Sequence, residues 1–270
     1  MVQVGQILRE RYQLQRLLGM RPNREVWLAG DRQTRAPVVV KLLTMLDPSS
    51  WADLKLFERE ARVLKKLSHP QIPEYLDFFE FEDQSFGVGL VETYIPGRSL
   101  GDCLQEGERF QEAELYGFAV QILEILIDLH ELNPPVLHRD IKPSNLILGE
   151  DGLLYLVDFG AVQDRVTPPG ESFTIVGTYG YTPIEQFGGQ TVPASDLYAL
   201  GATLVHLLTG VAPADLPQEN LKIQFRPYTS ASSEFIAWIE KLTNPSVQRR
   251  FQSARQALTA LQTPTPGQQV

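Results

Sequence analysis

Two short motifs near the middle of the chain carry residues suited to one kind of chemistry. Residues 138–145 read HRDIKPSN and include Asp140, Lys142 and Asn145, and Asp158 opens a DFG triplet thirteen positions after Asn145. A carboxylate such as Asp140 can orient a hydroxyl and accept its proton, while a carboxamide and a second carboxylate can hold Mg²⁺ against a transferring phosphate. The spacing therefore predicts phosphoryl transfer, with Asp140 as base, Lys142 beside the phosphate, and Asn145 and Asp158 as metal ligands.

Taken together, the two motifs resemble those of eukaryotic-like Ser/Thr protein kinases. The resemblance covers about residues 12–262, and residues 193–210 are similar to cyanobacterial members of the family. It implies an α+β, bilobal protein-kinase-like fold, with a small N-terminal lobe at about residues 12–93 and a larger, mainly helical C-terminal lobe at about 94–262. It also implies transfer of the γ-phosphate of ATP to a Ser or Thr hydroxyl of a protein substrate, with ATP and Mg²⁺ as cofactors.

The elements of the small lobe follow from hydrophobic periodicity. Alternation of apolar and polar residues predicts five antiparallel strands, at residues 12–19, 25–30, 37–43, 75–81 and 86–94. Apolar residues at helical spacing predict a helix at about 51–67, a long helix at 111–132 and a nearly all-apolar helix at 193–208. The Pro- and Gly-containing residues 263–270 are expected to form a flexible tail or the start of a linker.

The resemblance assigns further residues to the nucleotide. Lys41, in a β-branched run, matches the family's nucleotide lysine, and Glu60 matches the helix glutamate that pairs with it. Glu58 is the competing candidate, but Glu60 stands directly before Ala61, which is the family's register. Lys41 and Glu60 are thus expected to act with Asp140 and Lys142 in catalysis. The expected nucleotide-binding residues are Gly19, Val26, Val39, Lys41, Glu92, Tyr94 and Ile147.

The segment that should cover the phosphates departs from the family pattern. Residues 19–26 read GMRPNREV, so only the first glycine of the glycine-rich loop remains, and Pro22 lacks an N–H donor. Either Arg21 and Arg24 bind phosphate with their side chains, or they are solvated residues of a surface hairpin. The alternative function is therefore a pseudokinase, a binding or scaffolding module with weak or no turnover. A small-molecule phosphotransferase is a third possibility.

Two other residues are unusual for the adenine site that the resemblance implies. Val39 stands where many kinases have a small alanine. Glu92 falls at the back of the adenine pocket if residues 94–97 form the hinge between the lobes. If the alignment slips by one position, Glu92 is instead the ordinary first hinge residue.

The activation segment of the resemblance runs over residues 158–185. Residues 177–186 look like a substrate-docking stretch and favour a polypeptide acceptor. Glu185 is expected to pair with Arg250, and Thr178 to contact the catalytic loop. The candidate phosphorylation sites, whose phosphate Arg139 would bind, are Thr167, Ser172 and Thr174.

Asp196 matches a helix aspartate that caps the backbone of the catalytic loop in the family. The competing interpretation is an ordinary carboxylate at a helix N-terminus, where any protein would stabilise it.

Composition limits the remaining possibilities. The 270 residues, 43% of them hydrophobic, suffice for two lobes. Lys and Arg number 24 against 33 Asp and Glu, and the net charge of −9 with no basic run argues against nucleic-acid binding. Cys103 is the single cysteine, which favours a reducing, cytoplasmic location. The apolar stretch at 119–129 is interrupted by polar residues, so neither a membrane span nor a signal peptide is expected.

Overall fold

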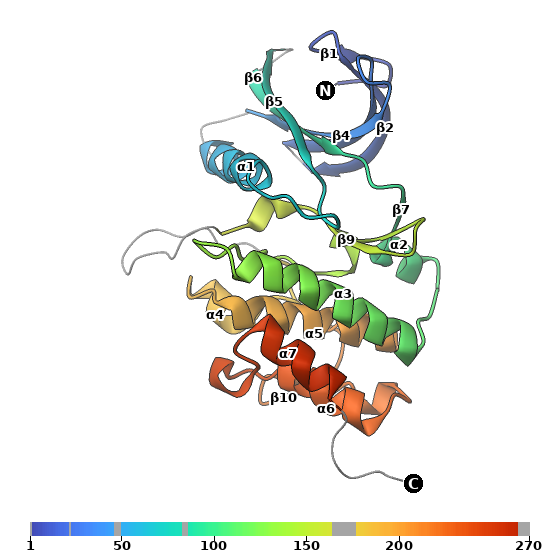
Figure 1. Ribbon diagram of the computed structural model, residues 1–270, viewed down its shortest axis with the longest axis vertical. Helices are drawn as coiled ribbons and strands as arrows, with labels where there is room; N and C mark the ends of the chain where they lie inside the picture. Colours follow the sequence, from blue (N-terminus) through green and yellow to red (C-terminus); the bar gives the residue numbers. More distant parts are fainter. Residues whose placement is uncertain (1, 22, 46–49, 83–85, 164–176, 264–270) are drawn as a thin grey trace. The chain divides into compact units, whose positions relative to one another are not determined.

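The structure is a computed structural model that describes residues 2–21, 23–45, 50–82, 86–163 and 177–263 (Figure 1). The chain divides into two compact units, Met1–Pro96 and Gly97–Val270. The first unit is built on a sheet and the second is mainly helical, which confirms the predicted fold class. Within the described residues, no helix is both long and apolar enough to cross a membrane.

The described residues of the first unit form one antiparallel sheet and one helix. The strands lie in the order β1 (Ile7–Leu8), β2 (Tyr12–Arg21), β3 (Arg24–Asp31), β4 (Pro37–Thr44), β6 (Phe86–Thr93) and β5 (Tyr75–Glu82), and the helix is α1 (Ser50–Leu64). The five predicted strands and the helix are confirmed. The sixth strand, β1, was not predicted, because two residues are too few to show an alternating pattern.

The two faces of this sheet have different surroundings. Val38, Val40 and Leu42 of β4 point into a core that also holds Trp27 and Phe79. Because side chains alternate along a strand, the residues between them point to the opposite face, which is the face that α1 covers. The buried lysine of β4 therefore lies on the helix side of the sheet.

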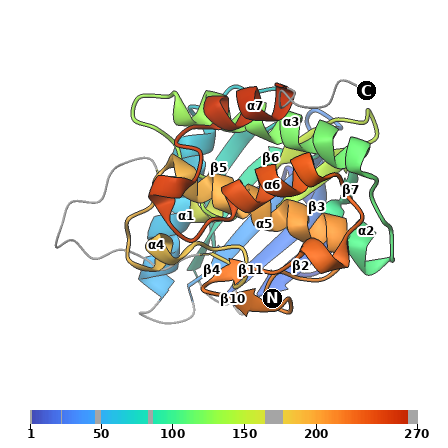
Figure 2. The ribbon, with the colours of Figure 1, turned by 90° about the horizontal axis from the view of Figure 1, so that it is seen from below.

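The second unit is organised around two long apolar helices, α3 (Glu112–His130) and α5 (Pro193–Thr209), at the places where helices were predicted. α5 is buried over most of its length, as expected for a nearly all-apolar stretch, whereas α3 buries one face, as its helical spacing of apolar residues predicts. Figures 1 and 2 show α7 lying along α3, and α6 packed beside α5. The other helices are α2 (Leu100–Gln105), α4 (Ile184–Phe187), α6 (Ser233–Leu242) and α7 (Ala254–Gln262), with 3-10 turns η1 (Pro143–Asn145), η2 (Phe159–Ala161), η3 (Arg226–Tyr228) and η4 (Val247–Arg249).

Trp238 links the last two helices of the second unit. It stacks on Phe235, lies 6.3 Å from the ring of Phe251, and donates a hydrogen bond of 3.0 Å to the carbonyl of Ala257. Trp238 is buried, so the indole N–H needs the partner that Ala257 provides.

Short strands of the second unit carry the sequence motifs. The antiparallel strands β7 (Gly97–Ser99), β8 (Leu146–Gly149) and β9 (Leu154–Leu156) form one small sheet, and β10 (Gln218–Glu219) pairs with β11 (Lys222–Ile223). Asn145 stands directly before β8, and Asp158 follows β9. Hairpin pairing of β8 with β9 therefore brings together two motifs that are thirteen residues apart in the chain.

Gly89 of β6 tests the packing of the first unit. A Cβ added to Gly89 would lie 2.5 Å from Cζ of Phe79, its cross-strand partner in the buried core. We expect Gly89→Ala to lower the free energy of unfolding by about 1–3 kcal/mol. The matched control is Gly117→Ala in α3, where no heavy atom lies within 4 Å and the substitution should stabilise by about 0.5–1 kcal/mol. Urea unfolding followed by circular dichroism measures the unfolding free energy of both variants. A change of the same sign in the two variants would contradict the packing argument.

Candidate active site

Lys41 and Glu60 form a buried ion pair in the first unit. The Nζ atom of Lys41 donates to Oε1 of Glu60 at 2.6 Å. Phe57, Ala61 and Leu64 bury one face of α1, and Glu60 lies on the same face. Glu58 is exposed, so the predicted pairing of Lys41 with Glu60 is confirmed over its competitor.

Glu92 is a second carboxylate beside Lys41. Its Oε1 atom lies 3.1 Å from the Lys41 Nζ atom, and its side chain is buried. Val39 is the cross-strand partner of Glu92, so both lie on the face of the sheet that carries Lys41. Of the two alignments considered above, the contact with Lys41 favours the one that puts Glu92 at the back of the adenine pocket over the one that makes it the first hinge residue.

The other nucleotide-binding candidates of this unit lie on the same sheet. Gly19 pairs with Val26, and Val26 pairs with Lys41, so the three form one row across β2, β3 and β4. Tyr94 follows β6 and is half-buried. Ile147 is in β8 of the second unit, two residues after Asn145.

The two arginines of the hairpin between β2 and β3 have different environments. Arg21 is exposed. The Nη1 atom of Arg24 lies 4.0 Å from Glu60 Oε2, its guanidinium lies over the Phe57 ring at 5.3 Å, and its side chain is only 16% exposed. Of the two interpretations left open above, that of two solvated arginines does not hold for Arg24, which faces the carboxylate that pairs with Lys41. Pro22 lies outside the described residues.

In the second unit, Asp140 is held by three donors. The Thr178 hydroxyl donates to Oδ1 at 2.8 Å. The Lys142 ammonium and the Asn145 amide donate to Oδ2 at 2.8 and 3.1 Å. Lys142 also donates to the Thr178 hydroxyl at 2.7 Å, so the predicted contact of Thr178 with the catalytic loop is confirmed.

Asp196 fixes the backbone that presents Asp140. The carboxylate is fully buried and accepts the backbone N–H groups of His138 at 3.0 Å and Arg139 at 2.8 Å. These bonds hold Arg139 at φ 70°, a left-handed conformation that is uncommon for a residue with a side chain. The predicted capping role of Asp196 is confirmed, and the interpretation as an ordinary helix-terminal carboxylate is wrong.

Asn145 and Asp158 fit a divalent cation. The backbone N–H of Val157 donates to the Asn145 carbonyl at 3.0 Å, which places Asp158 next to Asn145 at the end of the hairpin. The Asn145 amide nitrogen is bound to Asp140, which leaves its oxygen as the atom able to meet a metal. One carboxylate and one carboxamide suit Mg²⁺, which usually takes few protein ligands and completes its octahedron with water and phosphate oxygens.

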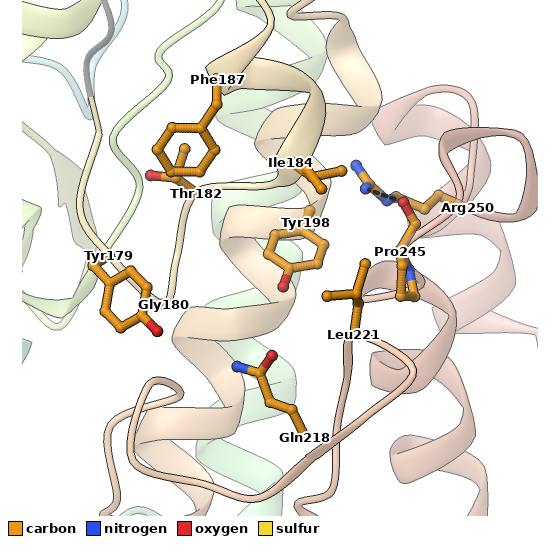
Figure 3. Close-up of a pocket in the computed structure, with 10 residues that line it drawn as sticks. All are labelled: Tyr179, Gly180, Thr182, Ile184, Phe187, Tyr198, Gln218, Leu221, Pro245 and Arg250. Atoms are coloured by element: carbon orange, nitrogen blue, oxygen red, sulfur yellow. Dashed lines mark hydrogen bonds between the residues drawn. The ribbon is translucent and has the colours of Figure 1, made fainter.

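Residues 177–186, the stretch expected to dock the substrate, contain Thr178, which contacts Asp140. Glu185 pairs with Arg250 through two bonds of 2.7 and 3.1 Å, as predicted. Arg250 also lines a pocket of about 250 Å³, drawn in Figure 3, where it donates to the Pro245 carbonyl. The pocket is lined mainly by apolar and aromatic side chains, contributed by Tyr179, Ile184, Phe187, Tyr198, Leu221 and Pro245. The candidate phosphorylation sites Thr167, Ser172 and Thr174 lie outside the described residues.

Comparison with known proteins matches residues 12–262 to the protein kinase domain. The chain belongs to the protein kinase family. It is 38% identical to serine/threonine-protein kinase B of Synechocystis sp. over 81% of this chain and 40% of that protein. It is 37% identical to serine/threonine-protein kinase F of Synechocystis sp. (77% of this chain, 45% of the relative) and 33% identical to serine/threonine-protein kinase PknA of Nostoc sp. (95% and 48%). The likeness to cyanobacterial kinases is confirmed, and the chain spans less than half the length of these relatives.

Two residues of the kinase site were not found from the sequence. The His130 Nε2 atom lies 2.8 Å from Asp196 Oδ2, at the end of α3. The buried amide of Gln186 donates to the Arg139 carbonyl at 2.8 Å. The partner of each residue is more than forty positions away in the chain, so no local pattern marks them.

Burial shapes the charges around the catalytic loop of the kinase. Burial opposes the charge of Asp196, but the hydrogen bonds from His130 and from the Arg139 backbone outweigh it and hold the pKa of Asp196 below its usual value. Burial lowers the pKa of His138, against the opposing influence of Asp196, Asp140 and Asp158. His138 therefore stays neutral in the folded kinase at neutral pH.

The lowered pKa of His138 predicts a pH dependence of folding. Below the unfolded-state pKa of about 6.5 the unfolded chain binds a proton that folded His138 does not. Stability is therefore full above that pH and falls as the pH decreases toward the folded-state pKa. We expect this group to cost up to about 1.4 kcal/mol between pH 7.5 and 5.5. His138→Phe should flatten the slope of unfolding free energy against pH whatever it does to the absolute stability. An unchanged slope would contradict a neutral His138.

Proposed function

We propose that this chain is the catalytic domain of an ATP-dependent Ser/Thr protein kinase, which transfers the γ-phosphate of ATP to a Ser or Thr hydroxyl of a protein. The observation that carries the proposal is the set of contacts around Asp140, made by Lys142, Asn145 and Thr178. We place the domain at residues 12–262, with an N-terminal lobe at about residues 12–93 and a C-terminal lobe at about residues 94–262.

Asp140 is proposed as the base. Its Oδ1 atom accepts a hydrogen bond from the Thr178 hydroxyl. A substrate hydroxyl would make the same kind of contact before it gives up its proton. Lys142 lies 2.8 Å from Oδ2 and is placed to meet the negative charge of the phosphate that this hydroxyl attacks. The two side chains support transfer to an alcohol by general base catalysis.

Membership of the protein kinase family implies use of ATP and a divalent metal. Asn145 and Asp158 would hold Mg²⁺, which neutralises charge on the phosphates when bound. Lys41, oriented by Glu60, is the proposed partner of the α- and β-phosphates. Gly19, Val26, Val39, Glu92, Tyr94 and Ile147 are the proposed residues of the nucleotide site.

The acceptor is proposed to be a polypeptide. Three similar proteins carry the name serine/threonine-protein kinase, and the apolar pocket begins at Tyr179, one residue after the Thr178 that contacts Asp140. No contact among the described residues favours the pseudokinase alternative. The cytoplasmic location stays a prediction.

Substitution of Asp140 tests the assignment of the base. Asp140→Asn keeps the size of the side chain but removes its ability to accept a proton, so phosphate transfer should fall by a factor of about 100 or more. The ATP-induced rise in melting temperature should persist, because Asp140 acts on the acceptor hydroxyl. Autophosphorylation with Mg²⁺-ATP is read by intact mass. The control is Glu240→Gln, an exposed carboxylate of α6. Retention of more than about a tenth of the rate would remove Asp140 from this role.

Substitution of Asp158 tests the metal site. Asp158 has φ 64°, a conformation that asparagine also tolerates, so Asp158→Asn changes charge with little backbone strain. We expect the variant to lose most of the increase in ATP affinity that Mg²⁺ gives to the wild type, while its affinity for adenosine stays the same. Calorimetric titration with and without Mg²⁺ measures both. An unchanged Mg²⁺ effect would contradict the assignment.

A further inference from the structure

Lys41 is shared by two buried carboxylates. Its ammonium lies 2.6 Å from Glu60 Oε1 and 3.1 Å from Glu92 Oε1, and the three side chains are 6%, 0% and 5% exposed. An ammonium has three N–H donors, so Lys41 can satisfy both carboxylates at once. Both partners compete for the lysine that the proposed function assigns to the nucleotide phosphates.

The sheet register explains why Glu92 reaches Lys41. Lys41 is directly opposite Leu90, and Glu92 is two residues further along β6. Such diagonal neighbours lie on the same face of an antiparallel sheet and within reach of each other when their side chains are long. Glu92 stands in a strand whose other central residues, Val88, Leu90 and Val91, are buried apolar side chains. A carboxylate in such a strand is tolerated only with a cation beside it, and Lys41 is that cation.

Two carboxylates share the single positive charge of Lys41. Arg24 adds a positive charge on the Glu60 side, 4.0 Å from an Oε2 atom that accepts no hydrogen bond. Glu60 thus has two cations near it, and the ammonium of Lys41 is drawn toward Glu92 as well.

We propose that Glu92 is a positioning residue for Lys41, which holds the ammonium in competition with Glu60 and lowers the affinity of the site for a triphosphate. The effect on the triphosphate rests on the proposed function, whereas the pairing of Lys41 with Glu92 does not. Removing the charge of Glu92 takes one carboxylate away from Lys41. The positive charge that remains should attract phosphate more strongly.

A double-mutant cycle in the ligand-free protein tests the pairing. In the wild type, Lys41→Met removes the ammonium from both Glu60 and Glu92. In a Glu92→Gln background it removes the ammonium from the carboxylate of Glu60 alone. The fall in melting temperature caused by Lys41→Met should therefore be smaller by roughly 2–4 °C in the Glu92→Gln background. The matched control is Glu80→Gln, which removes the same charge from an exposed residue of β5 and should leave the cost of Lys41→Met unchanged. An equal cost in the Glu92→Gln and wild-type backgrounds overturns the proposal.

Titration of ATP and adenosine into the wild type, Glu92→Gln and Glu80→Gln tests the effect on the nucleotide, and it needs no Lys41 variant. The ratio of the ATP to the adenosine dissociation constant should fall at least about threefold in Glu92→Gln and stay constant in Glu80→Gln. The ratio to adenosine separates phosphate contacts from any change in nucleoside contacts. A constant or higher ratio in Glu92→Gln overturns the proposal. Failure of all three proteins to bind ATP would instead overturn the proposed function, and the double-mutant cycle would still decide the pairing.

Discussion

The buried carboxylate of Asp196 is the interaction on which the catalytic loop depends. It lies at the start of α5, inside an apolar bundle, where an uncompensated charge would be costly. Two backbone N–H groups of the loop and the ring of His130 compensate the charge. The same bonds hold Arg139 in a left-handed conformation, and this turn of the chain directs Asp140 toward Lys142 and Thr178. One buried charge thus links helix packing to the geometry of the proposed base.

The buried ion pair of Glu185 and Arg250 holds the segment that follows Thr178. Arg250 holds Glu185 with two bonds and also donates to the carbonyls of Ala194 and Asn244. Glu185 lies in the short helix α4 beside Gln186, whose side-chain amide donates to the carbonyl of Arg139. Hydrogen bonds therefore join residues 185–186 to the catalytic loop at Arg139, and both segments to α5. Breaking the pair of Glu185 and Arg250 would leave a desolvated charge.

The sequence predicts elements and motif residues well when the signal is local. Alternation identified β2 to β6, and helical periodicity identified α1, α3 and α5, because these segments are long enough to show their period. β1 and the small sheet of β7, β8 and β9 were not predicted, since strands of two to four residues show no period. The partners His130 and Gln186 were also not predicted, because their contacts depend on tertiary packing.

Arg24 and Glu92 illustrate the same limit inside the first unit. In the sequence, Arg24 is part of a polar stretch that predicts a hairpin, and Glu92 stands near the end of a predicted strand. Only the register of β3, β4 and β6 and the packing of α1 place both around the Lys41–Glu60 pair. Spacing in the chain is a sufficient guide where a motif encodes a rigid loop, as at Asp140 and Asn145. It is insufficient where charges from four separate elements meet.

The tryptophans give each unit a spectroscopic signal of its own. Trp27 is buried in the sheet core of the first unit, and Trp238 is buried between α6 and α7 of the second. Trp51, the third, is largely exposed on α1. With Trp51 replaced by phenylalanine, the two remaining indoles become fluorescence reporters for different halves of the chain. Single-tryptophan variants then show whether the halves unfold in one transition or in two, and to which half a ligand transfers its stabilisation.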